Sequence, residues 1–580
     1  MAALQPVRKL TIVAKDPGLR LGPKGPMVFA QVDVPAEILA PGPTGYRVKV
    51  VDYNATERRA YAARQRYQDD DTLLDPFAPG EGEALTDPDY QARVMADPNF
   101  HAQNCYAIAM RTLGLFERAL GRRVGWSSGG HQLHIAPHAF ALANAFYSEP
   151  DRALMFGYFF DDAGKPVFTA LSHDVVAHET THAVLDGLRS RYTEPSGPDQ
   201  AAFHEGFADI VAILSIFSLP EVVAAGLGVT AKLPGLGEPL AFITTDKVTS
   251  EAIRASILLG IGAEIGMASG GGRGALRQSV KMEPRADILD DPEMAEAHNR
   301  GEVVVAAMTR AFVELWTTRI SHLGTFGSRG YNLAAVVEEG AKTAAQLLQM
   351  AIRAIDYCPP TDLDFGQFLA SLLTADRELV PDDSRFGYRA SVRKSFADFG
   401  IVPPVGQTDA EGCWPHFVPK GKKELRYSRS NAEALTRDVD ECFRFLWENR
   451  DPLGITERGY TQVVSLDTSL RIDPDGIPFR ETICQYVQLG HFFGAELMSI
   501  CKIDPLPDGF TTKSSADLFG GGVVVFDQYG RVKYHIGNGL IDGSRQKRRL
   551  EYLRDTGQLR VQRGDERNRF ANLHLARIGG

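Results

Sequence analysis

Two histidines separated by three residues give this sequence its clearest chemical signal. They are the ends of the segment His178-Glu179-Thr180-Thr181-His182, and apolar residues flank this segment at helical spacing. Residues four apart on a helix lie one turn apart on one face, so both imidazoles can bind a single metal ion. This spacing is typical of zinc sites in which the glutamate beside the first histidine acts as a general base. We therefore predict zinc ligands at His178 and His182 and a catalytic base at Glu179.

A second helical segment, which ends near Phe217, supplies the other donors that such a site requires. Glu205 is predicted to be the third zinc ligand, and three protein ligands leave a fourth position open, as catalytic zinc sites do. Asp209 lies one turn after Glu205 and is predicted to accept a hydrogen bond from a ligand histidine. The alternative is an amphipathic helix that exposes two polar residues, but the apolar residues on both sides of the motif favour a buried helix.

Length, charge and cysteine usage narrow the class of protein. A chain of 580 residues predicts about two to four domains, and the content of 44% hydrophobic and 23% charged residues is ordinary for a globular fold. The net charge of -10 argues against a general nucleic-acid binder, and no apolar run predicts a membrane span. We see no secretory signal at the N-terminus. The six cysteines have no CxxC spacing, which predicts free thiols and a cytoplasmic location.

Hydrophobic spacing predicts where helices and strands lie in the first 404 residues. Short apolar runs between Pro and Gly predict a small N-terminal extension of strands and turns at residues 1–44. Alternation predicts strands at residues 132–159, with residues 144–147 as an edge strand. Helical periodicity recurs in several later segments, at residues 104–121, 303–316, 333–355, 365–378 and 389–399. Pro403 and Pro404 then mark a domain boundary.

Residues 405–580 are predicted to form a separate accessory domain of α+β type. A helix is expected at residues 431–447, and alternating residues on both sides of a turn at residues 527–530 predict a β-hairpin. The tail after Ser544 is rich in arginine, which is typical of a solvated face and, less often, of a surface for an anionic partner. Any partner or regulator of the protein is expected to act through this domain.

Over residues 45–404 the sequence resembles the thermolysin-like (M4) metallopeptidases of the gluzincin class. An HExxH motif with a downstream glutamate is similar to that class, whereas metzincins have a third histidine at the position of Leu188. Other similar segments follow in the family's order: Asn144-Ala145-Phe146-Tyr147 resembles its substrate-binding edge strand, Asp174-Val175-Val176-Ala177 its lead-in to the zinc helix, Ala275-Leu276-Arg277 its carbonyl-binding segment, and His298 with Gly301 its second catalytic histidine.

The resemblance implies an α+β fold of two lobes with a cleft between them. The β-rich lobe and the zinc helix would occupy residues 45–190, and the helical lobe residues 191–404. His298 and Tyr192 would donate hydrogen bonds to the developing oxyanion. An acid before His298 would orient it, and Glu293 and Glu296 are the candidates.

The resemblance also implies how a peptide would bind. Asn144 and Ala145 would pair with the backbone of an extended substrate, and Arg277 would bind the carbonyl beyond the cleaved bond. Val175 and Leu276 would line an apolar pocket, so cleavage is expected before bulky apolar residues.

Two features depart from the family pattern. The segment between His182 and Glu205 is longer than usual, which lengthens a loop. Ile216 occupies the position of a carboxylate that binds calcium in secreted members, although Asp174 is retained. Calcium is therefore not expected at the family's double site.

These features predict a zinc-dependent endopeptidase with one zinc ion per chain and a peptide or protein as substrate. A gluzincin aminopeptidase is one alternative, although the sequence has no Gly-x-Met-x-Asn segment to capture a substrate amine. The other alternative is a peptidase fold used for binding, with its cleft covered by residues 405–580. The retention of Glu179 argues against that loss of chemistry.

Overall fold

The chain folds into a mixed α and β structure. The computed structural model describes Pro6 to Gln558 apart from residues 18–25, 70–71, 128–129, 162, 195, 229–240, 261–278, 420–423, 429, 432 and 473–477, and apart from the side chains of residues 256–260. Helices make up 44% and strands 21% of the structure, which confirms the α+β class predicted from the sequence.

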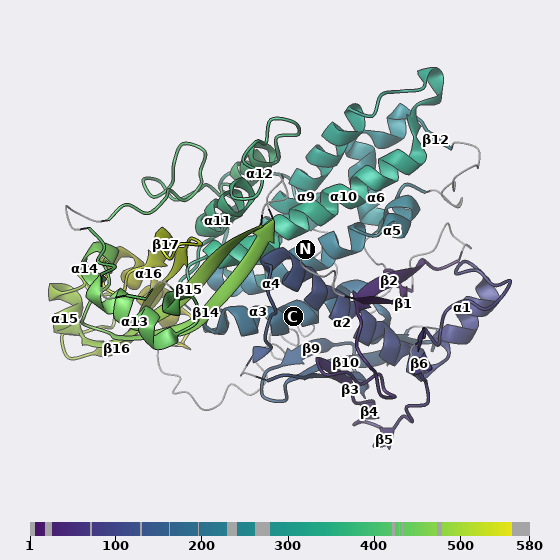
Figure 1. Ribbon diagram of the computed structural model, residues 1–580, viewed down its shortest axis with the longest axis horizontal. Coiled ribbons are helices and arrows are strands. Elements are labelled where there is room, and N and C mark those ends of the chain that lie inside the picture. The colour runs from purple at the N-terminus through teal and green to yellow at the C-terminus, as the bar shows by residue number, and fades with distance from the viewer. Residues whose placement is uncertain are drawn as a thin grey trace.

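Long helices dominate the middle of the chain and long strands its last part (Figure 1). The helices are α1 (Pro88–Met95), α2 (Pro98–Leu120), α3 (His173–Leu188), α4 (Pro198–Phe217), α5 (Pro220–Gly226), α6 (Ser250–Gly260), α9 (Ala297–Ser321), α10 (Leu333–Ala354), α11 (Phe365–Arg377), α12 (Tyr388–Ala397), α13 (Val439–Glu448), α14 (Arg450–Leu453), α15 (Gly494–Ser499) and α16 (Gly543–Asp555). The strands are β1 (Val7–Val13), β2 (Phe29–Pro35), β3 (Val48–Val50), β4 (Tyr53–Asn54), β5 (Arg59–Ala60), β6 (Gln68–Asp69), β7 (Thr72–Leu73), β8 (Leu133–Phe140), β9 (Ala145–Ser148), β10 (Ala153–Phe160), β11 (Pro166–Phe168), β12 (Phe242–Ile243), β13 (Tyr331–Asn332), β14 (Tyr460–Ile472), β15 (Pro478–Phe493), β16 (Ser515–Phe526) and β17 (Val532–Asn538).

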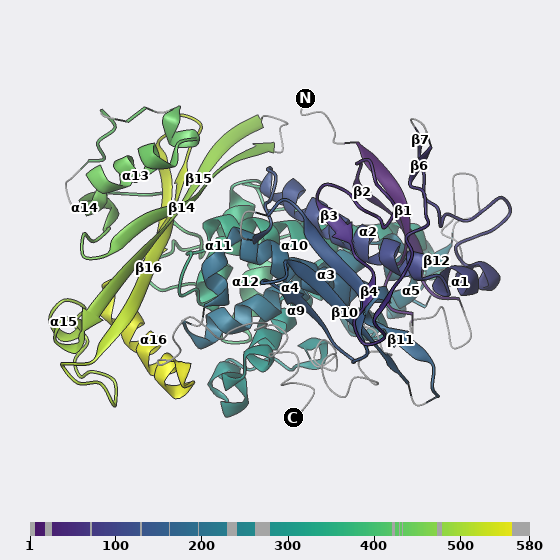
Figure 2. The same cartoon turned by 90° about the horizontal axis from the view of Figure 1, so that it is seen from below.

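The central helices separate two regions that are rich in strands. Figure 2 shows α3, α4, α9, α10 and α11 between the N-terminal strands on one side and β14, β15 and β16 on the other. The zinc helix α3 therefore has the N-terminal sheet on one flank and the helical region on the other.

The N-terminal sheet has the strand order β11-β10-β8-β3, with β9 paired to β10. Strand β8 runs parallel to β10, whereas β9 runs antiparallel to β10, with Ala145 opposite Phe156 and Ser148 opposite Ala153. Within the described part of the chain β9 pairs with β10 alone, so the predicted edge strand is confirmed.

The described residues of the predicted N-terminal extension pack on α2 and share apolar clusters with later parts of the chain. Strands β1 and β2 make an antiparallel ladder that packs on α2. Leu10 and Val32 are buried in the same apolar cluster as Val176 and Val184 of the zinc helix. All six cysteines are also buried and unpaired, in agreement with the predicted free thiols.

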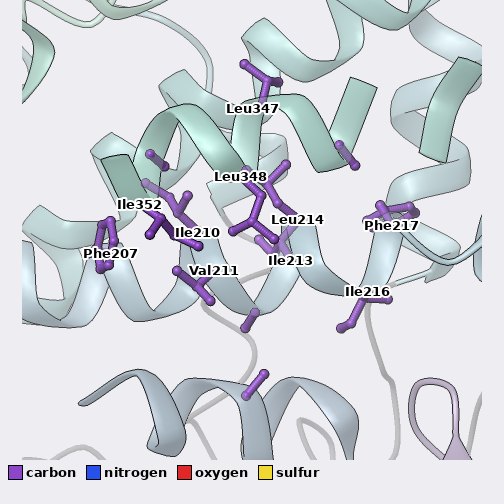
Figure 3. Close-up of a cluster of buried hydrophobic side chains, with 14 of the residues drawn as sticks. Phe207, Ile210, Val211, Ile213, Leu214, Ile216, Phe217, Leu347, Leu348 and Ile352 are labelled. Carbon is purple, nitrogen blue, oxygen red and sulfur yellow. The ribbon is translucent and has the colours of Figure 1, made fainter. Parts of the chain in front are cut away.

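Helix α4 is buried on all sides because it packs on α3, α9 and α10. In Figure 3, Ile210 and Leu214 of α4 lie beside Ile352 and Leu348 of α10. Each such buried aliphatic side chain contributes about 1.5–3 kcal/mol to folding. By length and composition α4 passes the test for a membrane-crossing helix, but 89% of its most apolar window is buried inside the protein, which is the pattern of a core helix.

Helices α4 and α9 cross at a pair of glycines. A Cβ atom on Gly206 would lie 2.8 Å from the carbonyl oxygen of Gly301, and a Cβ atom on Gly301 would lie 2.8 Å from the carbonyl oxygen of Ala202. Side chains at these positions would force the helices apart. The close crossing brings the first turn of α9, which carries His298, next to the part of α4 that carries Glu205.

The described part of residues 405–580 docks on the helical region. Strands β14 to β17 form an antiparallel sheet in sequence order. One face of this sheet packs on α13, where Phe445 contacts Phe526. The opposite face packs on α11 and the residues before it, where Tyr534 contacts Tyr357 edge to face. This unit is therefore joined to the rest of the protein by a continuous apolar interface.

Two elements within residues 405–580 can be compared with the sequence predictions, a hairpin and a helix. The predicted hairpin is confirmed as β16 and β17, in which Val525 is opposite Tyr534. Helix α13 begins at Val439, later than predicted, because the Asp438 side chain accepts the backbone N–H groups of Asp440 and Glu441 and so caps the helix there.

A buried ion-pair network crosses the same interface. The fully buried carboxylate of Asp356 lies 2.7 Å from Arg122, which follows α2, and 3.1 Å from Arg471 of β14. Arg471 also lies 3.2 Å from Glu481 of β15. Burial raises the pKa of Asp356, but the two arginines outweigh it, so this pKa lies below its usual value. Each charged side chain of this network is therefore stabilised by the opposite charges of its neighbours.

Replacing Asp356 with alanine leaves two buried guanidinium groups without their shared counter-charge. We expect the free energy of unfolding, measured by urea denaturation, to fall by about 3–5 kcal/mol. The control Glu338→Ala removes an exposed ion pair with Lys342 and is expected to change it by less than about 1 kcal/mol. Equal stabilities of the two variants would contradict the importance of the buried network.

Candidate metal centre

The three predicted zinc ligands converge from two helices. His178 and His182 lie one turn apart on α3, and their Nε2 atoms are 3.0 Å apart. The Oε2 atom of Glu205 on α4 is 3.5 Å from His178 Nε2 and 3.6 Å from His182 Nε2. Among the described residues, no other group of three His, Cys, Asp or Glu side chains places its donor atoms within 4.8 Å of one another.

The chemistry of these donors fits a zinc ion. The Nδ1–H group of His178 donates to the carboxylate of Asp209 over 2.7 Å, as predicted, so the Nε2 lone pair faces the other ligands. His182 and Glu205 are almost fully buried. Nitrogen and oxygen atoms held this close and away from water are stabilised by a positive charge, either a proton on His178 or a cation between them. Two imidazoles and one carboxylate are a typical catalytic zinc set.

Electrostatics at the cluster also favour a cation. Burial raises the pKa of Glu205, but His182, His298 and His178 outweigh it, so this pKa lies well below its usual value and the carboxylate is ionised. Burial lowers the pKa of His178, but Asp209 and Glu205 outweigh it, so this pKa lies well above its usual value. The surroundings of His178 therefore stabilise positive charge.

His204 lies beside the second predicted ligand, His182. His204 is buried, and its Nδ1 atom lies 2.7 Å from Nδ1 of His182. If Nε2 of His182 binds a metal, its Nδ1 carries the proton and donates it to His204. His204 then accepts through Nδ1. The one sequence signal for this residue is its position directly before Glu205.

Glu179, the predicted base, connects the zinc helix to strand β9. It is 2% exposed, and its Oε2 atom accepts a 2.9 Å hydrogen bond from the backbone N–H of Tyr147. The hydroxyl of Tyr147 donates to Asp186, further along the same helix, over 2.9 Å. Burial raises the pKa of Asp186 to about 6, and the hydrogen bond from Tyr147 offsets part of this effect. Two contacts from one residue therefore fix the position of β9 against α3.

The edge of β9 that is not paired with β10 faces α3. The Asn144 carbonyl accepts the N–H of Gly157 on β10, so the next residue, Ala145, turns its backbone groups to the opposite side. Tyr147 has the same orientation, and its N–H reaches Glu179. An extended peptide can add to this edge as a further strand. The side chain of Asn144 accepts the N–H of Ala145 over 2.9 Å, so it must rotate to contact a peptide.

His298 lies beside the ligands on the first turn of α9. Its Nε2 atom is 3.6 Å from Glu205 Oε2, and its Nδ1 atom is 2.7 Å from Glu296 Oε1. The acid that contacts His298 is therefore Glu296, and not Glu293, whose backbone carbonyl accepts from Asn299. Burial raises the pKa of Glu296, but His298 outweighs it, and this pKa is lowered to about 2. Glu296 also caps α9 through the N–H of Asn299, which fixes its side chain.

The residues of the predicted site that remain to be placed are Tyr192, Val175, Leu276 and Arg277. Tyr192 is buried and its hydroxyl donates to the carbonyl of Pro359 over 2.7 Å, a structural contact that speaks against the predicted oxyanion role. Val175 is fully buried in the main core. Leu276 and Arg277 lie outside the described residues.

Three residues bear on the calcium site of the family that the sequence resembles. Ile216 is buried and offers no oxygen ligand. Asp174 accepts the backbone N–H of Val175 over 3.0 Å at the start of α3. The ammonium of the buried Lys15 lies 5.8 Å from the ring of Phe217, next to Ile216. The absence of calcium from this position stays a prediction.

No protein-family model matches the chain, and no curated protein matches its sequence. The geometry of the site therefore carries the functional argument.

Removing the His204 side chain should weaken metal binding, because it leaves Nδ1 of His182 without its acceptor. We expect His204→Ala to raise the zinc dissociation constant about 10- to 100-fold in a competition titration against a chromophoric chelator. His204→Asn keeps an acceptor and should restore most of the affinity. His131→Ala changes an exposed histidine and should have no effect. Wild-type affinity in His204→Ala would rule out this role.

Proposed function

We propose that the protein is a zinc-dependent endopeptidase of the thermolysin-like type. The observation that carries this proposal is the convergence of His178, His182 and Glu205 beside Glu179, which itself lies against the free edge of β9. The arrangement of a strand-rich region and a helical region on the two flanks of α3 supports a cleft of that type (Figure 2).

The reaction would divide among residues of α3, α4 and β9. The three ligands would hold the zinc ion and leave one position open. A bound zinc ion would supply Lewis-acid polarisation of the scissile carbonyl. Glu179 takes a proton from the attacking water and passes it to the amide nitrogen as the C–N bond breaks. Asp209 and His204 hold the Nδ1 protons of the ligand histidines, which directs both Nε2 atoms toward the metal.

His298 is the proposed stabiliser of the developing oxyanion. His298 would contact Glu296 through Nδ1 and donate a hydrogen bond from Nε2 to the carbonyl oxygen. A preorganised donor of this kind is worth about 10²- to 10³-fold in rate. The contact of Tyr192 with Pro359 leaves this task to His298.

The substrate is proposed to be an extended peptide that pairs with Ala145 on the outer edge of β9 and with the Asn144 side chain after it rotates. Cleavage before bulky apolar residues stays a prediction, because Leu276 and Arg277 lie outside the described residues. A gluzincin aminopeptidase would use the same zinc ligands. N-terminally acetylated peptides separate the two activities, since an endopeptidase cleaves them and an aminopeptidase requires the free amine.

The most direct test of the base is Glu179→Gln, which keeps the size of the side chain and removes its ability to accept a proton. We expect one zinc ion to be retained and the turnover of an internally quenched peptide to fall about 10²- to 10⁴-fold. Glu338→Gln, a change on the exposed face of α10, serves as the control and should be fully active. Undiminished hydrolysis by Glu179→Gln would refute the mechanism.

The two acids before His298 form a matched pair of variants. Glu296→Gln weakens the contact that orients His298, so kcat should fall about ten- to a thousand-fold with KM little changed, given the usual worth of an oxyanion donor. Glu293→Gln leaves that contact intact and should behave as the wild type. The opposite ranking in a peptide-hydrolysis assay would assign the orienting role to Glu293.

A further inference from the structure

A cavity of about 530 Å³ lies at the far end of the helical region, where α9, α10, α11 and the residues before α12 meet the end of β14. None of the predicted zinc ligands lines it. Its apolar wall includes Met350, Leu379, Phe386 and Ile472. Its polar wall includes three arginines, Arg319, Arg353 and Arg385. The volume is within the range of small-molecule sites, which combine apolar walls with a few polar groups.

Arg353 lies partly buried in this wall without a counter-ion. Its Nε–H donates to the carbonyl of Ala119 over 3.2 Å, and a terminal N–H group donates to Oε1 of Gln349 over 3.1 Å. Both acceptors are neutral, and no carboxylate of the described residues makes an ion pair with Arg353. Burial and the nearby Arg471 lower the pKa of Arg353 to about 10, and the negative charge of Asp376 offsets part of this effect. The cavity wall therefore holds a positive charge that no carboxylate of the described residues contacts as an ion pair.

The acids around the cavity are committed to other groups. Asp376 lies 2.9 Å from Arg389, which neutralises it. Asp383 accepts the backbone N–H groups of Tyr388 and Arg389 at the start of α12. Asp382 accepts the N–H of Ser384. The nearest contacts of these carboxylates are therefore with groups other than Arg353, and Asp376 acts on the charge of Arg353 only from a longer distance.

The other two arginines differ in how they are held. Arg319 pairs with Glu339 and is fixed against Tyr388. Arg385 is exposed and stacks on the ring of Phe386, with its guanidinium carbon 4.9 Å from the ring centre. Arg385 therefore adds a cation at the solvent side of the cavity, beside the aromatic part of the apolar wall.

We propose that this cavity binds a small organic anion that has a carboxylate or phosphate head and an apolar body. The head lies against Arg353 and the amide N–H₂ of Gln349, whose oxygen already accepts from Arg353. The body lies against Met350, Leu379 and Phe386. A planar guanidinium matches either oxyanion with paired hydrogen bonds. This site goes beyond the proposed peptidase function and does not depend on it.

Isothermal titration calorimetry of the full-length protein with phenyl phosphate, phenylacetate and benzyl alcohol tests the proposal. The three probes share a ring and differ in the head group, so the tighter of the two anions identifies the preferred oxyanion. We expect saturable binding of at least one anion and none of the neutral alcohol. Arg353→Met, which keeps the apolar stem, should weaken that binding at least tenfold. Arg393→Met is the matched control, because this arginine of α12 donates to Ala410 outside the cavity.

The melting temperature of the ligand-free protein separates a binding role from a structural one. Arg353→Met should melt at the wild-type temperature or higher, because it removes a partly buried cation near Arg471. If Arg353→Met does not fold, Arg353→Gln replaces it in the calorimetric titration, because glutamine keeps a donor for the carbonyl of Ala119. The proposal is overturned if neither anion binds saturably, if the alcohol binds as tightly as the anions, or if the folded Arg353 variant binds as the wild type does.

Discussion

The close approach of three polar side chains, held away from water, is the constraint on which the centre of this fold depends. Two imidazole nitrogens and one carboxylate oxygen converge on one point from α3 and α4. Burial alone disfavours such an arrangement, since each group loses water and faces similar groups. A cation offsets both costs, and the hydrogen bond from His178 to Asp209 orients its donor in advance. These side chains could therefore hold a positive ion at this point.

The helices and the edge strand are positioned to serve that point. Glycines at the crossing of α4 and α9 allow the approach that places His298 beside Glu205. Tyr147 ties β9 to α3 through both its backbone and its hydroxyl, so the strand that would hold a peptide and the proposed base Glu179 move as one. The same apolar core contains β1, β2 and the zinc helix, so the N-terminal strands support the site and are not an appendage.

The spacing of apolar residues predicted many of the helices and strands, because the buried face of an element repeats apolar residues at the period of that element. Helix α10 was predicted at residues 333–355 and is observed at Leu333–Ala354, since its apolar positions repeat every turn over a long segment. The approach of His178 to His182 was predictable for a related reason, because their spacing within α3 is local. The contact between Asp356 and Arg471 joins residues far apart in sequence, and no periodic pattern in the sequence predicts it. The docking of the last part of the chain was missed for this reason.

In the candidate site, too, local contacts were predictable from the sequence and long-range contacts were not. The ligands, Glu179 and Asp209 follow from local spacing, whereas the choice of Glu296 over Glu293 depends on how α9 is capped. His204 has no motif of its own and gains its role only when α4 packs on α3. The contact of Tyr192 with Pro359 likewise depends on a distant loop.

Zinc stoichiometry tests the central claim most directly. The purified full-length protein would be stripped of metal, dialysed against limiting zinc and analysed for bound metal by mass spectrometry, alongside Glu205→Ala and Glu293→Ala. The account predicts one zinc ion per chain in the wild type and in Glu293→Ala, and much less in a folded Glu205→Ala. A wild-type protein that retains no zinc, or a Glu205→Ala variant that retains a full equivalent, would contradict it.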